Sequence, residues 1–193
     1  MTAVDRADKS DLRRQIRRRR AALSEAERAA ANEAIARRAS ALIARAGART
    51  IACYLSGSAE PPTRALLARA SAEGIRVLLP ISGPAGVLDW GLDGAGEQMN
   101  SMGVRETSAR PLGPDTLADA DLIFAPAAAV DTAGHRLGWG AGYYDRALAR
   151  LDSRPPVYAV LYDLDVLAHV PHEHHDVPVS GAVTPTRTLT FER

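Results

Sequence analysis

The stretch of sequence from residue 136 to residue 146 reads Arg136-Leu137-Gly138-Trp139-Gly140-Ala141-Gly142-Tyr143-Tyr144-Asp145-Arg146. A run of apolar residues at 122–126 precedes it, a short helical pattern continues from Tyr144, and another apolar run follows at 157–162. A buried strand, a glycine-rich loop, a helix and a further strand, in this order, predict a β-α-β unit with parallel strands. In such sheets ligands bind beyond the carboxyl ends of the strands, which is where this loop lies.

The composition of the loop suits an anionic ligand. Glycines at 138, 140 and 142 allow backbone N–H groups to approach a ligand without a Cβ atom in the way. The start of the following helix adds unpaired N–H donors, Arg136 can bind phosphate through two N–H groups, and Asp145 could hold Mg²⁺. Spacing alone leaves two interpretations equally open: phosphate binding, or a plain turn with Asp145 as a helix cap.

The rest of the chain extends this pattern. We expect one helix from Lys9 to about Leu23 and a second that begins with a capping box at Ser24 and ends at Gly47. The sequence then predicts strands at 50–55, 75–80, 87–90, 122–126, 157–162 and 182–184 (an edge strand), helices at 62–73 and 144–151, and a loop-rich segment at 91–113. These elements predict one α/β domain over residues 1–193, a Rossmann-like three-layer fold with a mostly parallel central sheet preceded by N-terminal helices.

Composition and charge narrow the function classes. The first 50 residues carry 13 of the 24 Lys and Arg and 6 of the 23 Asp and Glu, so a basic N-terminal section precedes an acidic body. The single cysteine, Cys53, excludes an intramolecular disulfide, and its apolar neighbours predict a buried, inert thiol. No apolar run approaches the ~18 residues of a membrane span and no secretory signal is present, so we expect a cytoplasmic protein.

The quoted loop resembles the signature of the 5-formyltetrahydrofolate cyclo-ligase (methenyltetrahydrofolate synthetase) family. Three further parts of the chain agree with that family in the expected order: Lys9 to Arg13 with Leu23–Arg28, Tyr54-Leu55-Ser56 with Glu60, and Val170-Pro171 with His174-His175-Asp176. The resemblance therefore covers the chain from Lys9 to about Pro185. It implies a monomeric enzyme that uses ATP as co-substrate and Mg²⁺ as cofactor to convert 5-formyltetrahydrofolate into 5,10-methenyltetrahydrofolate, ADP and phosphate, through phosphorylation of the formyl oxygen.

The same resemblance implies roles for individual residues. It implies that Lys9, Arg136 and Tyr143 are catalytic residues and that Asp145 and Asp176 are metal ligands. It places folate contacts at Leu55, Glu60, Trp139, Gly140, Ala141, Gly142 and Tyr143. It places ATP contacts at Lys9, Ser10, Asp11, Leu12, Arg13, Arg136, Leu137, Gly138, Trp139, Gly140, Ala141, Gly142, Tyr143 and Tyr144. Lys9 is also the only lysine in the chain. Two positions depart from the family pattern: Pro61-Pro62 follow the glutamate, and Ser180 stands where an acid is common.

The sequence leaves three other interpretations open. A paralogue could bind folate or nucleotide without turnover. The arginines at 13, 14 and 17–20 could bind nucleic acid, although no nucleic-acid motif accompanies them and a solvated helix face explains them better. A transition metal could bind to His169, His172, His174, His175 and Asp176, although their spacing fits no standard pattern and exposed histidines that flank the site are the preferred interpretation.

Overall fold

A seven-stranded sheet forms the centre of the computed structural model, which describes residues 3–173 and 176–191. Across the sheet the strands are β12 (Thr188–Thr190), β11 (Gly181–Val183), β9 (Val157–Val160), β6 (Leu122–Pro126), β1 (Thr50–Ala52), β2 (Arg76–Ser82) and β3 (Leu88–Leu92). The strands from β11 to β2 are parallel, whereas β12 and β3 at the two edges are antiparallel. The mostly parallel sheet predicted from the sequence is confirmed.

The strand order places a ligand crevice at one point of the sheet. From β1 the chain proceeds outward to β2 and then returns to add β6 on the other side of β1. The connections that leave β1 and β6 therefore diverge, and open α/β sheets bind ligands at such a switch point. Residues 53–63 follow β1, and residues 127–142, with the glycine-rich loop, follow β6.

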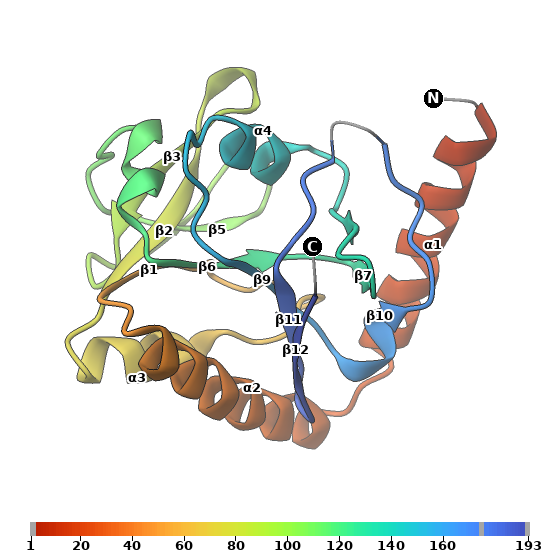
Figure 1. The fold of residues 1–193 in the computed structure, drawn as a ribbon, viewed down its shortest axis with the longest axis horizontal. Helices are drawn as coiled ribbons and strands as arrows, with labels where there is room; N and C mark the ends of the chain where they lie inside the picture. The colour runs from red at the N-terminus through yellow and green to blue at the C-terminus, as the bar shows by residue number, and fades with distance from the viewer. Residues whose placement is uncertain (1–2, 174–175, 192–193) are drawn as a thin grey trace.

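Helices cover both faces of the sheet, as Figure 1 shows. The helices α2 (Glu25–Ala46) and α3 (Arg64–Ala72) pack together on one face, and α4 (Tyr143–Ala149) with the 3₁₀ helix η2 (Pro114–Asp119) packs on the other. Successive strand residues alternate between these layers: Ile51 faces α2 and α3, and Ala52 faces the opposite layer. The predicted three-layer arrangement is confirmed.

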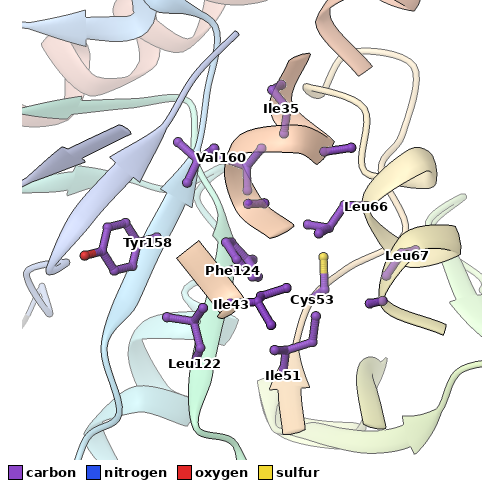
Figure 2. Close-up of a cluster of buried hydrophobic side chains, with 14 of the residues drawn as sticks. Ile35, Ile43, Ile51, Cys53, Leu66, Leu67, Leu122, Phe124, Tyr158 and Val160 are labelled. Atoms are coloured by element: carbon purple, nitrogen blue, oxygen red, sulfur yellow. The ribbon is translucent and has the colours of Figure 1, made fainter. Parts of the chain in front are cut away.

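Figure 2 shows the first of these cores, where Phe124 and Cys53 lie among aliphatic side chains of α2 and α3. Cys53 is fully buried, and burial raises the pKa of its thiol to about 12. The thiol is therefore protonated at neutral pH, as its apolar neighbours in the sequence predicted.

No helix in the described part of the chain is long and apolar enough to cross a membrane.

Smaller elements surround the central sheet. A hairpin of β4 (Glu97–Met99) and β5 (Arg105–Thr107) lies beside β2, and a second sheet has the order β10 (Val166–Leu167), β7 (Ala129–Asp131), β8 (Arg136–Leu137). The 3₁₀ helices η1 (Pro84–Gly86) and η3 (Asp163–Asp165) complete the elements. The first helix, α1 (Ala3–Ala21), lies outside the main sheet, against β7 and β10 (Figure 1).

Several local predictions hold and others need correction. The capping box at Ser24 and Glu27 is present, and Gly47 ends α2 with a φ of 63°. The strand β1 ends at Ala52 instead of Leu55, because the chain leaves the sheet there and the carbonyl of Tyr54 accepts from the hydroxyl of Thr63. The segment 91–113 contains the β4–β5 hairpin, and β11 is not an edge strand because β12 pairs outside it.

The arginines of α1 do not all form a solvated face. The side chains of Arg14, Arg17, Arg18 and Arg19 are exposed. Arg20, in the last turn of α1, is only 1% exposed. Its Nε donates to Asp165 at 2.9 Å, and its terminal nitrogens donate to the carbonyl groups of Ala59, Ala127 and Ala128 at 3.1, 3.0 and 2.9 Å. A planar guanidinium with several donors can satisfy all these groups at once. Arg20 therefore joins α1 to both connections at the switch point.

We expect Arg20→Gln to lower the free energy of unfolding by about 3–5 kcal/mol, because it leaves the buried carboxylate of Asp165 without its main partner. Arg19 also contacts Asp165, at 2.5 Å, but its side chain is 40% exposed. Arg19→Gln is therefore a matched control with an expected loss of at most about 1 kcal/mol. Urea denaturation of both variants measures the difference, and equal losses would show that burial of Arg20 does not matter.

Candidate functional site

Two adjoining pockets lie on either side of the glycine-rich loop. One has a volume of about 230 Å³ and is lined mainly by aromatic and aliphatic side chains. The other has a volume of about 390 Å³ and is lined mainly by charged side chains. Arg136, Gly138, Gly142 and Asp145 line both, so the loop forms the wall between them. A ligand in one pocket can thus meet a ligand in the other across this loop.

The apolar pocket collects residues from several separate parts of the chain, including Leu88 of β3 and Pro126 of β6. The connection after β1 supplies Tyr54, Leu55 and Glu60, and the end of β2 supplies Pro80 and Ser82. The β4–β5 hairpin and the loop that joins its strands supply Met102, Val104, Arg105 and Glu106, and the glycine-rich loop with the start of α4 supplies Trp139, Ala141, Tyr143 and Tyr144. Aromatic rings and aliphatic side chains in this number suit a flat ring system.

Four polar atoms of residues that line this pocket are buried and have no hydrogen-bond partner among the described residues. They are the hydroxyls of Tyr54 and Tyr144, Nε of Arg136 and the indole Nε1 of Trp139. Burial raises the pKa of both tyrosines well above the usual value, so their hydroxyls keep their protons and can donate. Buried donors without partners are rare in folded proteins, and their concentration here indicates a polar ligand.

Glu60 is the acidic group of the connection after β1. Its Oε2 accepts from the backbone N–H of Gly57 at 2.9 Å. Burial raises the pKa of Glu60, and the Gly57 hydrogen bond and the charge of Arg20 offset this only in part. The indole of Trp139 is near enough to lower this pKa slightly, although its N–H makes no well-aligned hydrogen bond. A ligand with N–H donors would find an acceptor here.

The charged pocket brings together cations and carboxylates from distant parts of the chain. Nζ of Lys9 lies 3.0 Å from Oε1 of Glu173 and 3.0 Å from Oδ2 of Asp176. Burial lowers the pKa of Lys9, but the two carboxylates outweigh this effect and the net shift is upward. Lys9 is therefore positively charged at neutral pH, although only 10% of its side chain is exposed.

The arginines of this pocket hold the loop in shape. Nε of Arg13 donates to the carbonyl of Gly138 at 2.7 Å, and a terminal nitrogen of Arg136 lies 2.5 Å from Oδ1 of Asp145. Arg146 donates to the carbonyls of Ala141, at 2.7 Å, and Gly86, at 2.9 Å. These bonds fix the loop backbone while parts of the guanidinium groups still face the pocket.

Glycine is required at two positions of the loop. Gly140 and Gly142 have φ values of 107° and 68°, which side chains other than hydrogen disfavour. A Cβ atom at Gly142 would also lie 2.8 Å from a terminal nitrogen of Arg146. Two of the three alternating glycines in the sequence therefore have a geometric reason, because their backbone conformation disfavours any other residue.

The structure places the predicted site residues as follows. The charged pocket is lined by Lys9, Arg13, Arg136, Leu137, Gly138, Gly140, Gly142, Asp145 and Asp176, and the apolar pocket by Leu55, Glu60, Arg136, Gly138, Trp139, Ala141, Gly142, Tyr143, Tyr144 and Asp145. Gly140, predicted to contact both ligands, lines only the charged pocket. Ser10, Asp11 and Leu12 line neither: Ser10 is exposed, Asp11 pairs with Arg14, and Leu12 packs on the core beneath α1.

Sequence reasoning missed several pocket residues. Glu173 and Arg146 line the charged pocket, and Tyr54 and the β4–β5 hairpin line the apolar one. Arg146 ended the quoted loop motif and Glu173 is three residues from Asp176, so both could have been found by their position. The hairpin gave no such signal, because its place in the same pocket as the glycine-rich loop depends on tertiary structure alone.

The two departures from the family pattern have structural explanations. Pro61 is buried and Pro62 partly so, and they lead into Thr63 at the start of α3. Ser180 joins the main sheet: its hydroxyl accepts from the N–H of Val157 at 3.1 Å, and its own N–H donates to the carbonyl of Val157 at 2.7 Å. Ser180 therefore pairs with β9 and does not line the charged pocket.

Comparisons with known proteins agree with this geometry. The model of the 5-formyltetrahydrofolate cyclo-ligase family matches residues 5–185. The 5-formyltetrahydrofolate cyclo-ligase of Mycolicibacterium smegmatis is 37% identical over 96% of this chain and 97% of that protein, and that of Haemophilus influenzae is 30% identical over 89% and 94%.

Solved structures show the same similarity. The 5,10-methenyltetrahydrofolate synthetase of Aquifex aeolicus superposes with a TM-score of 0.80 at 26% identity, over 96% of this chain and 93% of that one. The synthetase of Mycoplasma pneumoniae, at 22% identity, shares the fold with a TM-score of 0.74 over 92% and 99%. With a family match over nearly its whole length and two pockets that meet at the family's glycine-rich loop, the chain belongs to the 5-formyltetrahydrofolate cyclo-ligase family.

Proposed function

We propose that this protein converts 5-formyltetrahydrofolate and ATP into 5,10-methenyltetrahydrofolate, ADP and phosphate. The observation that carries the proposal is the junction of an apolar, aromatic pocket and a charged pocket at Arg136 and the glycine-rich loop. The apolar pocket suits a pterin ring, and the charged pocket suits the phosphates of a nucleotide. The reacting atoms of the two substrates would meet at the wall that the pockets share.

The chemistry needs no protein nucleophile. The formyl oxygen attacks the γ-phosphorus of ATP, the bond from phosphorus to the bridging oxygen breaks, and ADP leaves. The N10 nitrogen then attacks the activated formyl carbon, loses its proton, and phosphate departs with the former formyl oxygen as the ring closes. Phosphoryl transfer of this kind depends mostly on positioning and on neutralisation of charge.

Each group of side chains has a part in these steps. Lys9 and Arg13, which line the charged pocket, would bind phosphate oxygens, and Arg136, which lines both pockets, would contact both substrates. Backbone N–H groups of the loop would stabilise charge on the transferred group. The carboxylate of Glu60 can accept from the N–H groups of a pterin, and Tyr143 lines the pocket that would hold this ring.

The carboxylates of the charged pocket fit a magnesium ion. Asp145 and Asp176 line this pocket and offer the hard oxygen ligands that Mg²⁺ prefers. In the structure they pair with Arg136 and Lys9, so both are held at the pocket wall. Mg²⁺ would supply neutralisation of phosphate charge, and Asp145 and Asp176 would hold it.

The proposal includes the domain organisation, the oligomeric state and the cellular location of the enzyme. We propose a single domain over residues 1–193 that acts as a monomer in the cytoplasm on small-molecule substrates. The nucleic-acid alternative loses support because Arg20 is buried and Arg13 bonds to the loop, which leaves a smaller exposed basic face on α1. A silent paralogue is disfavoured because Lys9, Arg136 and Asp145 all line the same pocket.

The activity is tested by the rise of methenyl product absorbance when purified protein meets 5-formyltetrahydrofolate, ATP and Mg²⁺. We expect Lys9→Met to lower kcat/KM for ATP by about 10- to 100-fold, because a hydrogen bond to a charged group is worth about 1.5–3 kcal/mol. Arg14→Met is the matched control on the same helix, since Arg14 is exposed and pairs with Asp11 outside both pockets. No absorbance change while ATP still raises the melting temperature would mean that the protein acts on another substrate.

Glu60 provides a prediction on pH. The pKa of Glu60 is raised in the folded protein, so folding favours its protonated form. Glu60 therefore stabilises the folded state at low pH, and this stabilisation is lost as pH rises through the folded-state pKa. Glu60→Gln removes this cost, so we expect the substrate-free variant to be more stable than wild type at about pH 8 and no more stable at about pH 4. The variant should also bind the folate more weakly. Chemical denaturation at both pH values tests the first effect, and a stability difference that does not change with pH would refute it.

A further inference from the structure

A cluster of possible metal ligands lies outside both pockets, where β7 meets the segment that follows β10. Asp131 ends β7, and His169 and His172 belong to that segment. One donor atom from each of the three lies within 4.8 Å of the others. We propose that these residues bind a divalent transition-metal ion of the zinc class, at a site separate from the proposed magnesium site.

The backbone around the cluster is already fixed. Leu167 of β10 lies directly opposite Asp131 in the parallel pairing with β7, two residues before His169. The N–H of Val170 donates to Oδ2 of Asp131 at 3.1 Å, and the side chain of Val170 is fully buried beneath α1. The two histidines therefore flank a residue that is pinned to the carboxylate. This preorganisation lowers the entropy cost of bringing the three ligands together.

The hydrogen bonds leave histidine nitrogens available. Nδ1 of His172 lies 3.1 Å from the carbonyl oxygen of Val170, which can only accept, so the tautomer that fits carries its proton on Nδ1 and its lone pair on Nε2. His135 stacks on His172 with ring centroids 3.4 Å apart, and its Nδ1 lies 3.0 Å from Oδ2 of Asp131. A metal ion at Oδ2 would take the place of this ring N–H, while the stacked ring supports the orientation of His172.

The distances require only a small adjustment. Tetrahedral coordination with bonds of about 2.0–2.1 Å places ligand atoms about 3.3 Å apart. The side chain of Asp131 is 3% exposed and fixed by its neighbours, whereas His169 is exposed and can rotate to close the remaining gap. Two imidazoles with one carboxylate favour zinc-class ions over Mg²⁺, which prefers oxygen ligands.

The site lies next to the segment that contributes to the charged pocket. His172 immediately precedes Glu173, which pairs with Lys9, and Asp131 opens the turn that leads to His135 and Arg136. A bound ion would tie the end of β7 to the segment that carries Glu173. We therefore expect the ion to stabilise the folded protein and to support the position of this segment.

The transition-metal site suggested by the sequence has Asp176 as its carboxylate ligand instead of Asp131. That alternative grouped His169 and His172 with His174, His175 and Asp176, of which His174 and His175 lie outside the described residues. In the structure Asp176 pairs with Lys9, and Asp131 is the carboxylate near His169 and His172. The two arrangements can be separated by mutation.

The test is calorimetric titration of chelator-treated protein with Zn²⁺, in excess Mg²⁺ and without ATP or folate. We expect binding of one equivalent and a rise in melting temperature, and His169→Gln and His172→Gln should each weaken binding by at least about tenfold. Titration with Co²⁺ should give visible absorption bands that both variants lose. Because no substrate is present, failure here is distinguishable from failure of the proposed reaction.

The matched control is the double variant H174Q/H175Q, which removes the other histidines of this stretch and should leave Zn²⁺ binding unchanged. Loss of binding in this variant, with retention in His169→Gln and His172→Gln, would show adventitious binding by adjacent histidines and overturn the proposal. Absence of stoichiometric binding in the wild type would overturn it as well. Denaturation curves of the variants confirm that each one is folded.

Discussion

The buried guanidinium of Arg20 is the interaction on which the arrangement of the site depends. It lies in a helix outside the main sheet, yet it bonds to the connection after β1 at Ala59 and to the residues after β6 at Ala127 and Ala128. A buried charge with partners in three segments allows little displacement of any of them without loss of hydrogen bonds. Arg20 also lies 5.3 Å from the ring centroid of Trp139. One side chain thus sets α1, the Glu60 connection and the glycine-rich loop relative to one another.

The cations of the charged pocket are held in place by neighbouring carboxylates. Lys9 is held by Glu173 and Asp176, and Arg136 is held by Asp145. Without such partners, partly buried cations would repel one another and lose solvation. The same carboxylates are suited to a divalent ion, so phosphate and metal could replace the internal ion pairs when they bind. In the proposed reaction the pocket would therefore exchange one balanced set of charges for another.

The sequence was informative where local rules decide the structure. Apolar runs and turn residues located the parallel strands, the capping box at Ser24 located the start of α2, and the loop motif located most of the pocket wall. It failed where tertiary contacts decide. Arg20 resembled its exposed neighbours on α1, and nothing local indicated that hairpin residues such as Met102 would face Trp139 across a pocket. Helical spacing predicts which residues share a face but not which partner that face meets.

The position of Arg136 connects the fold to the proposed reaction. It lies on β8, after the switch point, and it is 4% exposed although it lines both pockets. One of its terminal nitrogens is bound by Asp145 and another by the carbonyl of Pro126, while its Nε has no partner among the described residues. In the proposed reaction, the transferred group would cross the wall that Arg136 lines together with Gly138, Gly142 and Asp145. A cation that is already fixed before the substrates arrive stabilises a moving phosphoryl group without the cost of reorganisation, which is the condition for catalysis by electrostatic stabilisation.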